Sequence, residues 1–420
     1  MVVGIIIGAS IFVQPSEVNK HVPSVPGVLS VWVVAGVLSL FGALVCAELS
    51  AAFPRTGGVY VFLKETLSPA CGFLWGWAMF WSAHSGIIAA SSVILARYVA
   101  FFAPMGDWGI RLTAMAAILL LSLVNYLGVR QGSLLQTTVT VAKVAVVAVL
   151  LAMVFVVGPP AGATIVNAAG TAVPFGEFVL GVSAALFAFG GWHMVTYTAG
   201  ETRRPEKTIP RALLIGSLLV TACYVALNAA YLHLLPLARV ISSTRVAADA
   251  AQVMAGPRGA AAISALVILS ATGVLNGVIL AGPRTYFAMA DEGLAFRWMA
   301  RIHPRFHTPY ATIALQAVWS CVLVATGTYR ALFTRVVYTE WLFFALMGIG
   351  LYRLRARAGY RPGYRMWGYR WVPLLFIGAS VVVAVVQVAA DPLQAGAGLL
   401  LVVLGLPVYF LWIRSKHAHH

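Results

Sequence analysis

The sequence is poor in charged residues, and in acidic residues above all. Only 12 of its 420 residues are Asp or Glu, and charged residues make up 10% of the chain, whereas 61% are hydrophobic. A water-soluble domain of this length needs far more polar surface. Because the apolar residues fall in many runs of about 20, the length at which a helix spans a bilayer, the sequence predicts an all-α, multi-pass membrane protein.

Cysteines and enzyme motifs are also scarce. The sequence has no nucleotide-binding loop, no HExxH, no CxxC pair and no cluster of catalytic side chains at one membrane depth. We therefore expect no enzyme activity, no cofactor and no metal. The cysteines lie in apolar runs without a pairing pattern, and we interpret them as small core residues. They are Cys46, Cys71, Cys223 and Cys321.

Twelve transmembrane helices are predicted. Their bounds are about 1–22, 27–53, 70–102, 110–130, 132–158, 177–200, 209–236, 259–291, 309–328, 330–354, 371–391 and 395–414. Pro210 is expected to open the seventh helix. With both termini in the cytoplasm, most of the 28 Lys and Arg residues fall on the cytoplasmic side, which is the positive-inside bias. The net charge of +16 is thereby explained without nucleic-acid binding.

Two apolar segments are interrupted by small residues at corresponding places, around Gly8 and around Gly190. Paired interrupted helices are the best pointer in a sequence to a transporter binding site. The chain then forms one transmembrane domain with two inverted five-helix repeats, at about 1–158 and 177–354. Helices within 371–414 are additional. The alternative is that each glycine only allows close helix packing.

An interrupted helix presents free backbone groups that suit a zwitterion. Carbonyls at the end of the first half-helix attract an ammonium group, and N–H groups at the start of the next attract a carboxylate. The second interruption would add carbonyls, and a phenylalanine before it could cover the ligand. The residues expected to bind substrate are Ile5, Ile6, Gly8, Ala9, Ser10, Ile11, Phe187, Ala188, Phe189, Gly190 and His193.

Lys143 is a charged residue inside an otherwise uncharged predicted span. It lies about 16 Å beyond Gly132 along a helix, which is deep for a side chain that snorkels to the surface. Because intramembrane charges are costly, we expect Lys143 to serve function or a structure tied to function. Glu340 is another intramembrane ionisable residue, and the sequence does not fix the direction in which it points.

The chain from Gly4 to about Trp412 resembles the amino acid–polyamine–organocation superfamily, and within it the L-type amino acid transporter-like permeases. The motifs that carry the resemblance are Gly8-Ala9-Ser10-Ile11-Phe12, Ala47-Glu48-Leu49, Thr56-Gly57-Gly58-Val59-Tyr60, Phe187-Ala188-Phe189-Gly190-Gly191-Trp192 and Glu201…Pro205…Ile209-Pro210-Arg211-Ala212. The resemblance implies the LeuT-like five-plus-five inverted fold with discontinuous helices 1 and 6.

The resemblance also implies roles for single residues. It implies that the substrate carboxylate binds at Gly8, Ala9 and Ser10, and that the substrate amine binds carbonyls of helices 1 and 6. It also implies that Phe187 is a gate and that Lys143 occupies the place of a sodium ion in sodium-dependent relatives. Two residues depart from the family pattern: Ser10 replaces a usual glycine, and His193 stands where asparagine is common. No cysteine lies between Phe101 and Trp108, so we expect no disulfide-linked heavy chain and a prokaryotic type.

The sequence therefore predicts sodium-independent amino acid transport across the cytoplasmic (inner) membrane by alternating access, with exchange of neutral amino acids. The expected partners are the amino acid substrate and the lipid bilayer. The alternatives are proton-coupled symport, transport of cationic amino acids or polyamines, and a nutrient receptor that does not transport. A carboxylate in the binding site would favour cationic substrates, and Glu340 is the candidate for it.

Overall fold

The computed structural model of the chain describes residues 1–157, 173–327 and 329–417, and these residues form helices and loops without a strand. The first helical elements are α1 (Val2–Ile6), η1 (Ala9–Phe12), α2 (Gln14–His21), α3 (Val25–Ala52), α4 (Val59–Thr66), α5 (Pro69–Ala78), η2 (Met79–Ala83), α6 (His84–Val99), α7 (Asp107–Tyr126) and α8 (Val129–Val157). The later elements are α9 (Phe175–Ala188), η3 (Trp192–Glu201), α10 (Pro205–Leu234), α11 (Leu237–Ser242), α12 (Val246–Asp291), η4 (Arg297–Ala300), α13 (Tyr310–Thr326), α14 (Tyr329–Arg355), α15 (Val372–Ala390), α16 (Pro392–Val403) and α17 (Gly405–His417).

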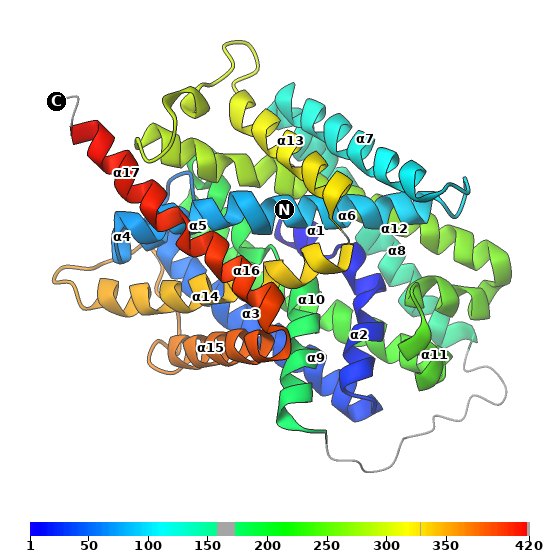
Figure 1. The fold of residues 1–420 in the computed structure, drawn as a ribbon. Helices are drawn as coiled ribbons and strands as arrows, with labels where there is room; N and C mark the ends of the chain where they lie inside the picture. The colour runs from blue at the N-terminus through cyan, green and yellow to red at the C-terminus, as the bar shows by residue number, and fades with distance from the viewer. Residues whose placement is uncertain (158–172, 328, 418–420) are drawn as a thin grey trace.

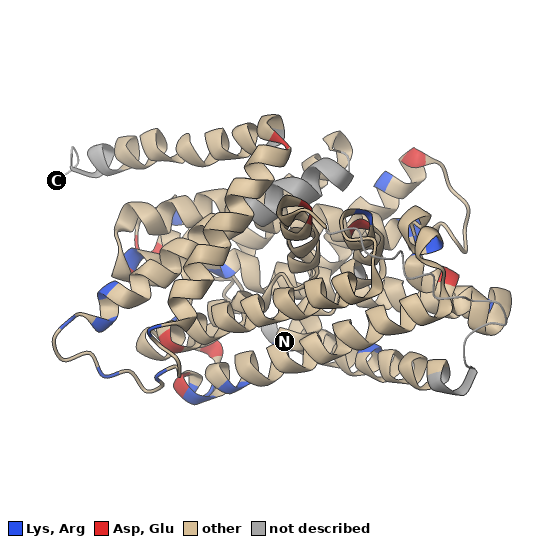
Figure 2. Cartoon of the chain, turned by 90° about the horizontal axis from the view of Figure 1, so that it is seen from below, with Lys and Arg blue, Asp and Glu red and all other residues tan. Residues whose placement is uncertain are grey.

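Nine helices within the described ranges are long and apolar enough to cross a membrane. The long helices carry few charged residues, and Lys and Arg gather at helix ends and in loops (Figure 2). The predicted all-α membrane architecture is thus confirmed. The predicted number of twelve spans stays a prediction, because the first span is divided into short pieces and α13 has only 17 residues.

The short helix α1 lies at the centre of the molecule, where it packs against α8, α10, α12 and η3 (Figure 1). Close approach depends on small residues. A Cβ atom at Gly216 of α10 would lie 2.6 Å from the Val2 side chain, and one at Gly36 of α3 would lie 2.3 Å from Thr221 of α10. A five-residue helix is unstable alone, so packing against its neighbours stabilises α1.

Helix α10 begins earlier than predicted. It starts at Pro205, and Pro210 lies inside it. Arg204 has φ 49°, a left-handed conformation that ends the preceding loop, and Pro205 then occupies the first helical turn, where a missing N–H costs nothing. The expectation that Pro210 opens this helix is therefore wrong.

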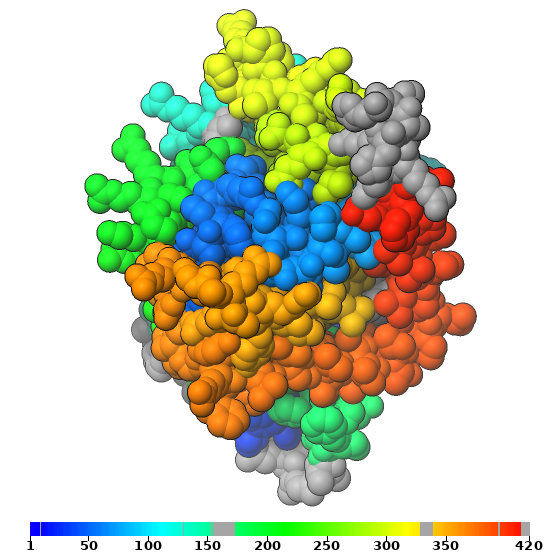
Figure 3. All heavy atoms as spheres, turned by 90° about the vertical axis from the view of Figure 1, so that its left-hand side faces the viewer, coloured from blue at the N-terminus to red at the C-terminus, as the bar shows by residue number. Residues whose placement is uncertain are grey.

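Loops from distant parts of the sequence meet on one side of the molecule, which we call the loop face. The segment 53–68 with its helix α4, the start of α10, the end of α12 and residues 356–371 lie there together (Figure 3). The Arg357 guanidinium donates to the Glu65 carbonyl at 2.7 Å, which joins two of these segments. The sequence patterns did not predict α4, because eight residues are too short for a clear helical period.

Candidate functional site

The first predicted helix is interrupted at Gly8. Helix α1 ends at Ile6, Ile7 has ψ 86°, and Gly8 is extended with φ −107° and ψ −173° before η1 begins. The backbone at Gly8 lies so close to α12 that a Cβ atom there would be 2.7 Å from the Val274 methyl carbon Cγ2. Glycine is required here by this close approach, not by the φ angle.

The second interruption follows α9 and touches the first. Gly191 has φ 93°, which favours glycine, and a Cβ atom there would lie 2.4 Å from Ile5 Cγ2. The Gly190 N–H donates to the Phe187 carbonyl at 3.1 Å, which closes the turn. The two segments that the sequence pairs by position are therefore neighbours in space.

One hydroxyl group bridges the two interruptions. Tyr224 of α10 is buried, and its Oη donates to the Ile6 carbonyl at 2.6 Å and lies 3.0 Å from the Ala188 carbonyl. Both carbonyls are at the ends of helices, where no intrahelical N–H reaches them. Tyr224 was not among the predicted site residues, because a tyrosine in an apolar helix gives no sign of where its hydroxyl points.

A cavity of about 40 Å³ lies where the two interruptions face α6, α12 and α14. Seven predicted residues line it: Ile5, Ile6, Gly8, Ser10, Phe187, Ala188 and Gly190. Glu340, which the sequence offered as the candidate carboxylate of the site, also lines it. The sequence did not predict the remaining lining residues, which are Ile87, Ser91, Ile94, Leu186, Gly191, Trp192, Met194, Val274, Val278, Trp341 and Phe344.

Three predicted residues lie outside this lining. Ile11 is fully buried, and the Phe189 ring packs against Tyr224 with centroids 4.9 Å apart. The His193 ring lies behind the cavity, with its centroid 5.0 Å from that of Phe344. The side chain of Ala9 lies outside the part of the structure that is described.

Lys143 of α8 reaches the end of α1. Its Nζ donates to the carbonyls of Gly4 and Ile7, at 2.5 Å each, and the Ser270 hydroxyl donates to the same Ile7 carbonyl at 3.2 Å. The lysine side chain is fully buried. A cation at the C-terminal end of a helix is favoured by the helix dipole, and each bond to it is charge-assisted. Lys143 therefore links α8 to the first interruption, and Ser270 links α12 to it.

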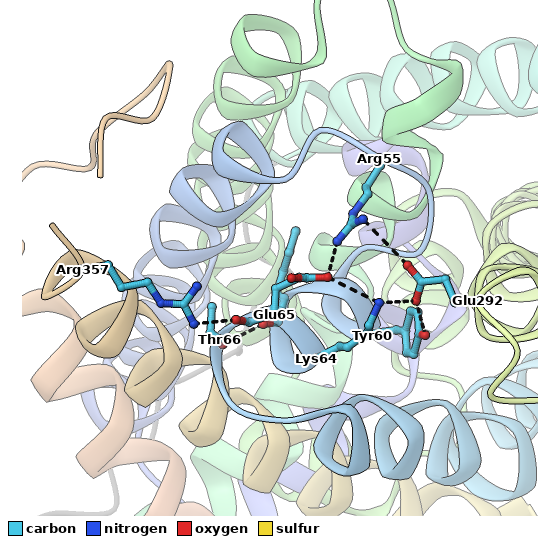
Figure 4. A network of polar contacts seen from close by, with 8 residues as sticks. Arg55, Tyr60, Lys64, Glu65, Thr66, Glu292 and Arg357 are labelled. Carbon is cyan, nitrogen blue, oxygen red and sulfur yellow. Dashed lines mark hydrogen bonds and ion pairs between the residues drawn. The ribbon is translucent and has the colours of Figure 1, made fainter. Parts of the chain in front are cut away.

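An ion-pair cluster lies on the loop face, where α4 meets the end of α12 (Figure 4). The Lys64 ammonium pairs with Glu292 at 2.8 Å and with Glu65 at 3.4 Å, and Arg55 pairs with Glu65. Tyr60 donates to Glu292. Burial raises the pKa of the Tyr60 hydroxyl, and the Glu292 carboxylate raises this pKa further, so Tyr60 keeps its proton. We call these five residues the loop-face cluster.

Two further carboxylates near the loop face pair with arginines. Glu48 is fully buried and accepts from Arg355 Nε at 2.7 Å and Nη2 at 2.5 Å. Glu201 accepts from Arg284 Nε at 2.8 Å and Nη2 at 2.9 Å. Such two-point pairs have fixed geometry. They join α3 to α14 and η3 to α12, so polar contacts connect separate helices near the loop face.

An all-helical membrane protein in which two interrupted helices share one cavity has the architecture of a secondary transporter. The family comparison agrees with this class. The chain belongs to the amino acid permease family, whose model matches residues 1–409. Its substrate is an amino acid, and the protein is a multi-pass membrane protein. The resemblance that the sequence motifs indicated is thereby confirmed.

Relatives along the whole chain are transporters and exchangers by name, not enzymes. The chain is 31% identical over 420 residues to the serine/threonine exchanger SteT of Bacillus subtilis, covering 99% of this chain and 95% of that one. It is 27% identical to the human cystine/glutamate transporter over 98% of this chain and 83% of that one. It is 29% identical to the human large neutral amino acids transporter small subunit 2, over 99% of this chain and 79% of that one.

Proposed function

We propose that the protein is a sodium-independent exchanger of neutral amino acids that works by alternating access. The observation that carries this proposal is the cavity between the interruptions at Gly8 and Gly190. The substrate carboxylate would bind N–H groups at the start of η1, and the ammonium group would bind carbonyls at the ends of α1 and α9. The printed names of relatives, which include an exchanger, support exchange.

Sodium independence is supported by Lys143. Its ammonium group already makes bonds of 2.5 Å to two carbonyls at the first interruption. In sodium-coupled transporters, unwound carbonyls of this kind coordinate the ion. A fixed protein cation at these carbonyls makes a bound sodium ion unnecessary for closing this part of the site.

The proposed cycle moves the interrupted helices against α6, α12 and α14, as two inverted repeats would allow. The ring of Phe187 lines the cavity and would cover the bound amino acid as a gate. The loop face would be cytoplasmic, in line with its arginines, and the membrane would be the cytoplasmic one. No disulfide-linked heavy chain would be needed for transport.

Reconstitution of the full chain in liposomes tests this proposal. We expect labelled alanine to enter vesicles loaded with unlabelled alanine at the same rate in sodium and in choline buffer, and not to enter vesicles without internal amino acid. Uptake into empty vesicles driven only by an inward proton gradient would instead establish proton symport. Binding of alanine without any uptake would indicate a receptor.

A further inference from the structure

Among the described residues that line the cavity, Glu340 of α14 is the one with a charged side chain. Most of the wall is apolar. The hydroxyls of Ser10 and Ser91 and the indole groups are the other polar side-chain groups. Trp341, which follows Glu340, also lines the cavity, so this stretch of α14 faces the space where the substrate side chain would extend.

One oxygen of the buried Glu340 side chain lacks a hydrogen-bond partner. It is 4% exposed, and its Oε1 atom has no hydrogen-bond partner. His193 Nε2 lies 4.0 Å away, which is beyond hydrogen-bond distance, and both ring nitrogens of His193 are also unpartnered. Within the described ranges, no Lys or Arg nitrogen lies within 4.0 Å of Glu340. Buried carboxyl groups in membrane proteins normally have partners, so a ligand is the natural one here.

The cavity also limits the size of that ligand. Its volume of about 40 Å³ corresponds to roughly three water molecules. The aromatic residues Trp192, Trp341 and Phe344 form part of its wall. A substrate held by its backbone groups at the two interruptions would therefore reach Glu340 with a short side chain.

We propose that Glu340 makes this site selective for amino acids whose short side chain ends in a hydrogen-bond donor, either a hydroxyl or an ammonium group, and selective against side-chain carboxylates. The inference rests on the amino acid exchange proposed above and widens its substrate class from neutral amino acids to include short side chains that carry an ammonium group. A donor would satisfy the free Oε1 atom, whereas an apolar side chain of the same shape would leave that atom buried and unpaired. A side-chain carboxylate would place a second acidic group against this buried carboxyl group, and the two could not both be ionised there.

Competition against labelled alanine in counterflow measures this selectivity. The test uses pairs of amino acids that differ in one terminal group: threonine against valine, 2,4-diaminobutyrate against norvaline, and asparagine against aspartate. We expect each first member to inhibit at a concentration at least about tenfold lower than its partner, because sites with a buried polar group reject analogues that cannot pair with it. The threonine and diaminobutyrate arms separate a hydroxyl preference from an ammonium preference.

Glu340→Gln keeps the shape of the side chain and removes its charge. In this variant the asparagine-to-aspartate and diaminobutyrate-to-norvaline ratios should each fall by about tenfold. Glu340→Leu should also abolish the threonine-to-valine ratio. Glu206→Gln, at the start of α10, is the matched control and should keep all wild-type ratios. Wild-type ratios within twofold of one, or ratios unchanged in Glu340→Gln, would overturn the proposal.

The same pairs are measured as ligand-dependent thermal stabilisation of the purified full chain, so that the test does not depend on transport. Discrimination in binding without exchange would refute the proposed function and support the role of Glu340. Exchange without discrimination between the paired amino acids would support the proposed function and refute the role of Glu340. If no amino acid stabilises or crosses, both are refuted.

Discussion

Replacing Lys143 with methionine tests the central link of the site. Methionine has a similar length and is apolar, so Lys143→Met removes the charge and the donors with little change in volume. Two bonds of 2.5 Å to the Gly4 and Ile7 carbonyls are lost. Hydrogen bonds to charged groups contribute about 1.5–3 kcal/mol each, so α1 loses about 3–6 kcal/mol of stabilisation at its end.

That loss is large compared with the energy differences between transporter conformations. If the substitution destabilises the substrate-binding state by about 3 kcal/mol relative to the other states, exchange slows by roughly 100-fold. The assay is counterflow of labelled alanine, normalised to the amount of monodisperse protein in the membrane. Lys207→Met, on an exposed part of α10, is the control and should exchange like the wild type. A Lys143→Met rate above half of the wild-type rate would refute the reasoning.

Lys143→Ala extends the same test. It leaves the Gly4 and Ile7 carbonyls and the Ser270 hydroxyl around the space that Nζ occupied. Unwound carbonyls coordinate sodium in other transporters. We therefore expect the slow exchange of Lys143→Ala to rise several-fold when sodium replaces choline, while the wild type does not respond. Equal rates in both buffers would show that the lysine does not stand in for a cation.

Three further substitutions follow from single contacts. Tyr224→Phe leaves a buried carbonyl without its donor, which costs about 1–3 kcal/mol, and should lower the thermal midpoint of the purified protein; an unchanged midpoint would argue against the bridge. Glu292→Gln weakens the partly exposed loop-face cluster by at most about 1 kcal/mol. In this variant, a cysteine introduced at Ser91 should react with a thiol reagent added on the loop side up to about fivefold faster. An unchanged labelling rate would argue against a role of the cluster in closing that side. The Gly8→Ala variant should lose uptake, because the added methyl group crowds the Val274 side chain. Adding Val274→Ala to this variant should restore part of the uptake. If the two substitutions lower uptake additively, the contact does not explain the loss.

The features that the sequence predicted well each have a strong local cause. Small residues at Gly8 and at Gly190 interrupt apolar runs, and few other physical reasons produce such interruptions at matched positions. Lys143 was visible because a charge inside a membrane span is rare. In each case the residue type itself departs from its surroundings, so a linear sequence is enough to locate it.

The features that the sequence did not predict depend on the direction in which a side chain points. Tyr224 looks like any aromatic residue in a helix interface, and only the packing of α10 on α1 points its hydroxyl at the Ile6 carbonyl. His193 was expected to bind substrate, but it is not among the residues that line the cavity, and its ring packs against Phe344. The residues that α14 contributes, such as Phe344, are indistinguishable in sequence from core aromatics. Tertiary packing decides these cases, and residue type does not.

The contacts at the two interruptions also bear on why a polar site is stable inside a membrane. Unwound backbone in lipid is tolerated only where its polar groups are satisfied. Here the protein satisfies the acceptors with its own side chains: Lys143 and Ser270 donate to Ile7, and Tyr224 donates to Ile6. A carbonyl oxygen has two lone pairs, so the Ile6 carbonyl, which accepts one of these bonds, can still accept from a substrate ammonium, whereas the Ile7 carbonyl already accepts two. Side chains of the protein thereby stabilise the unwound backbone, and under the proposed function the energy of substrate binding would drive the conformational change.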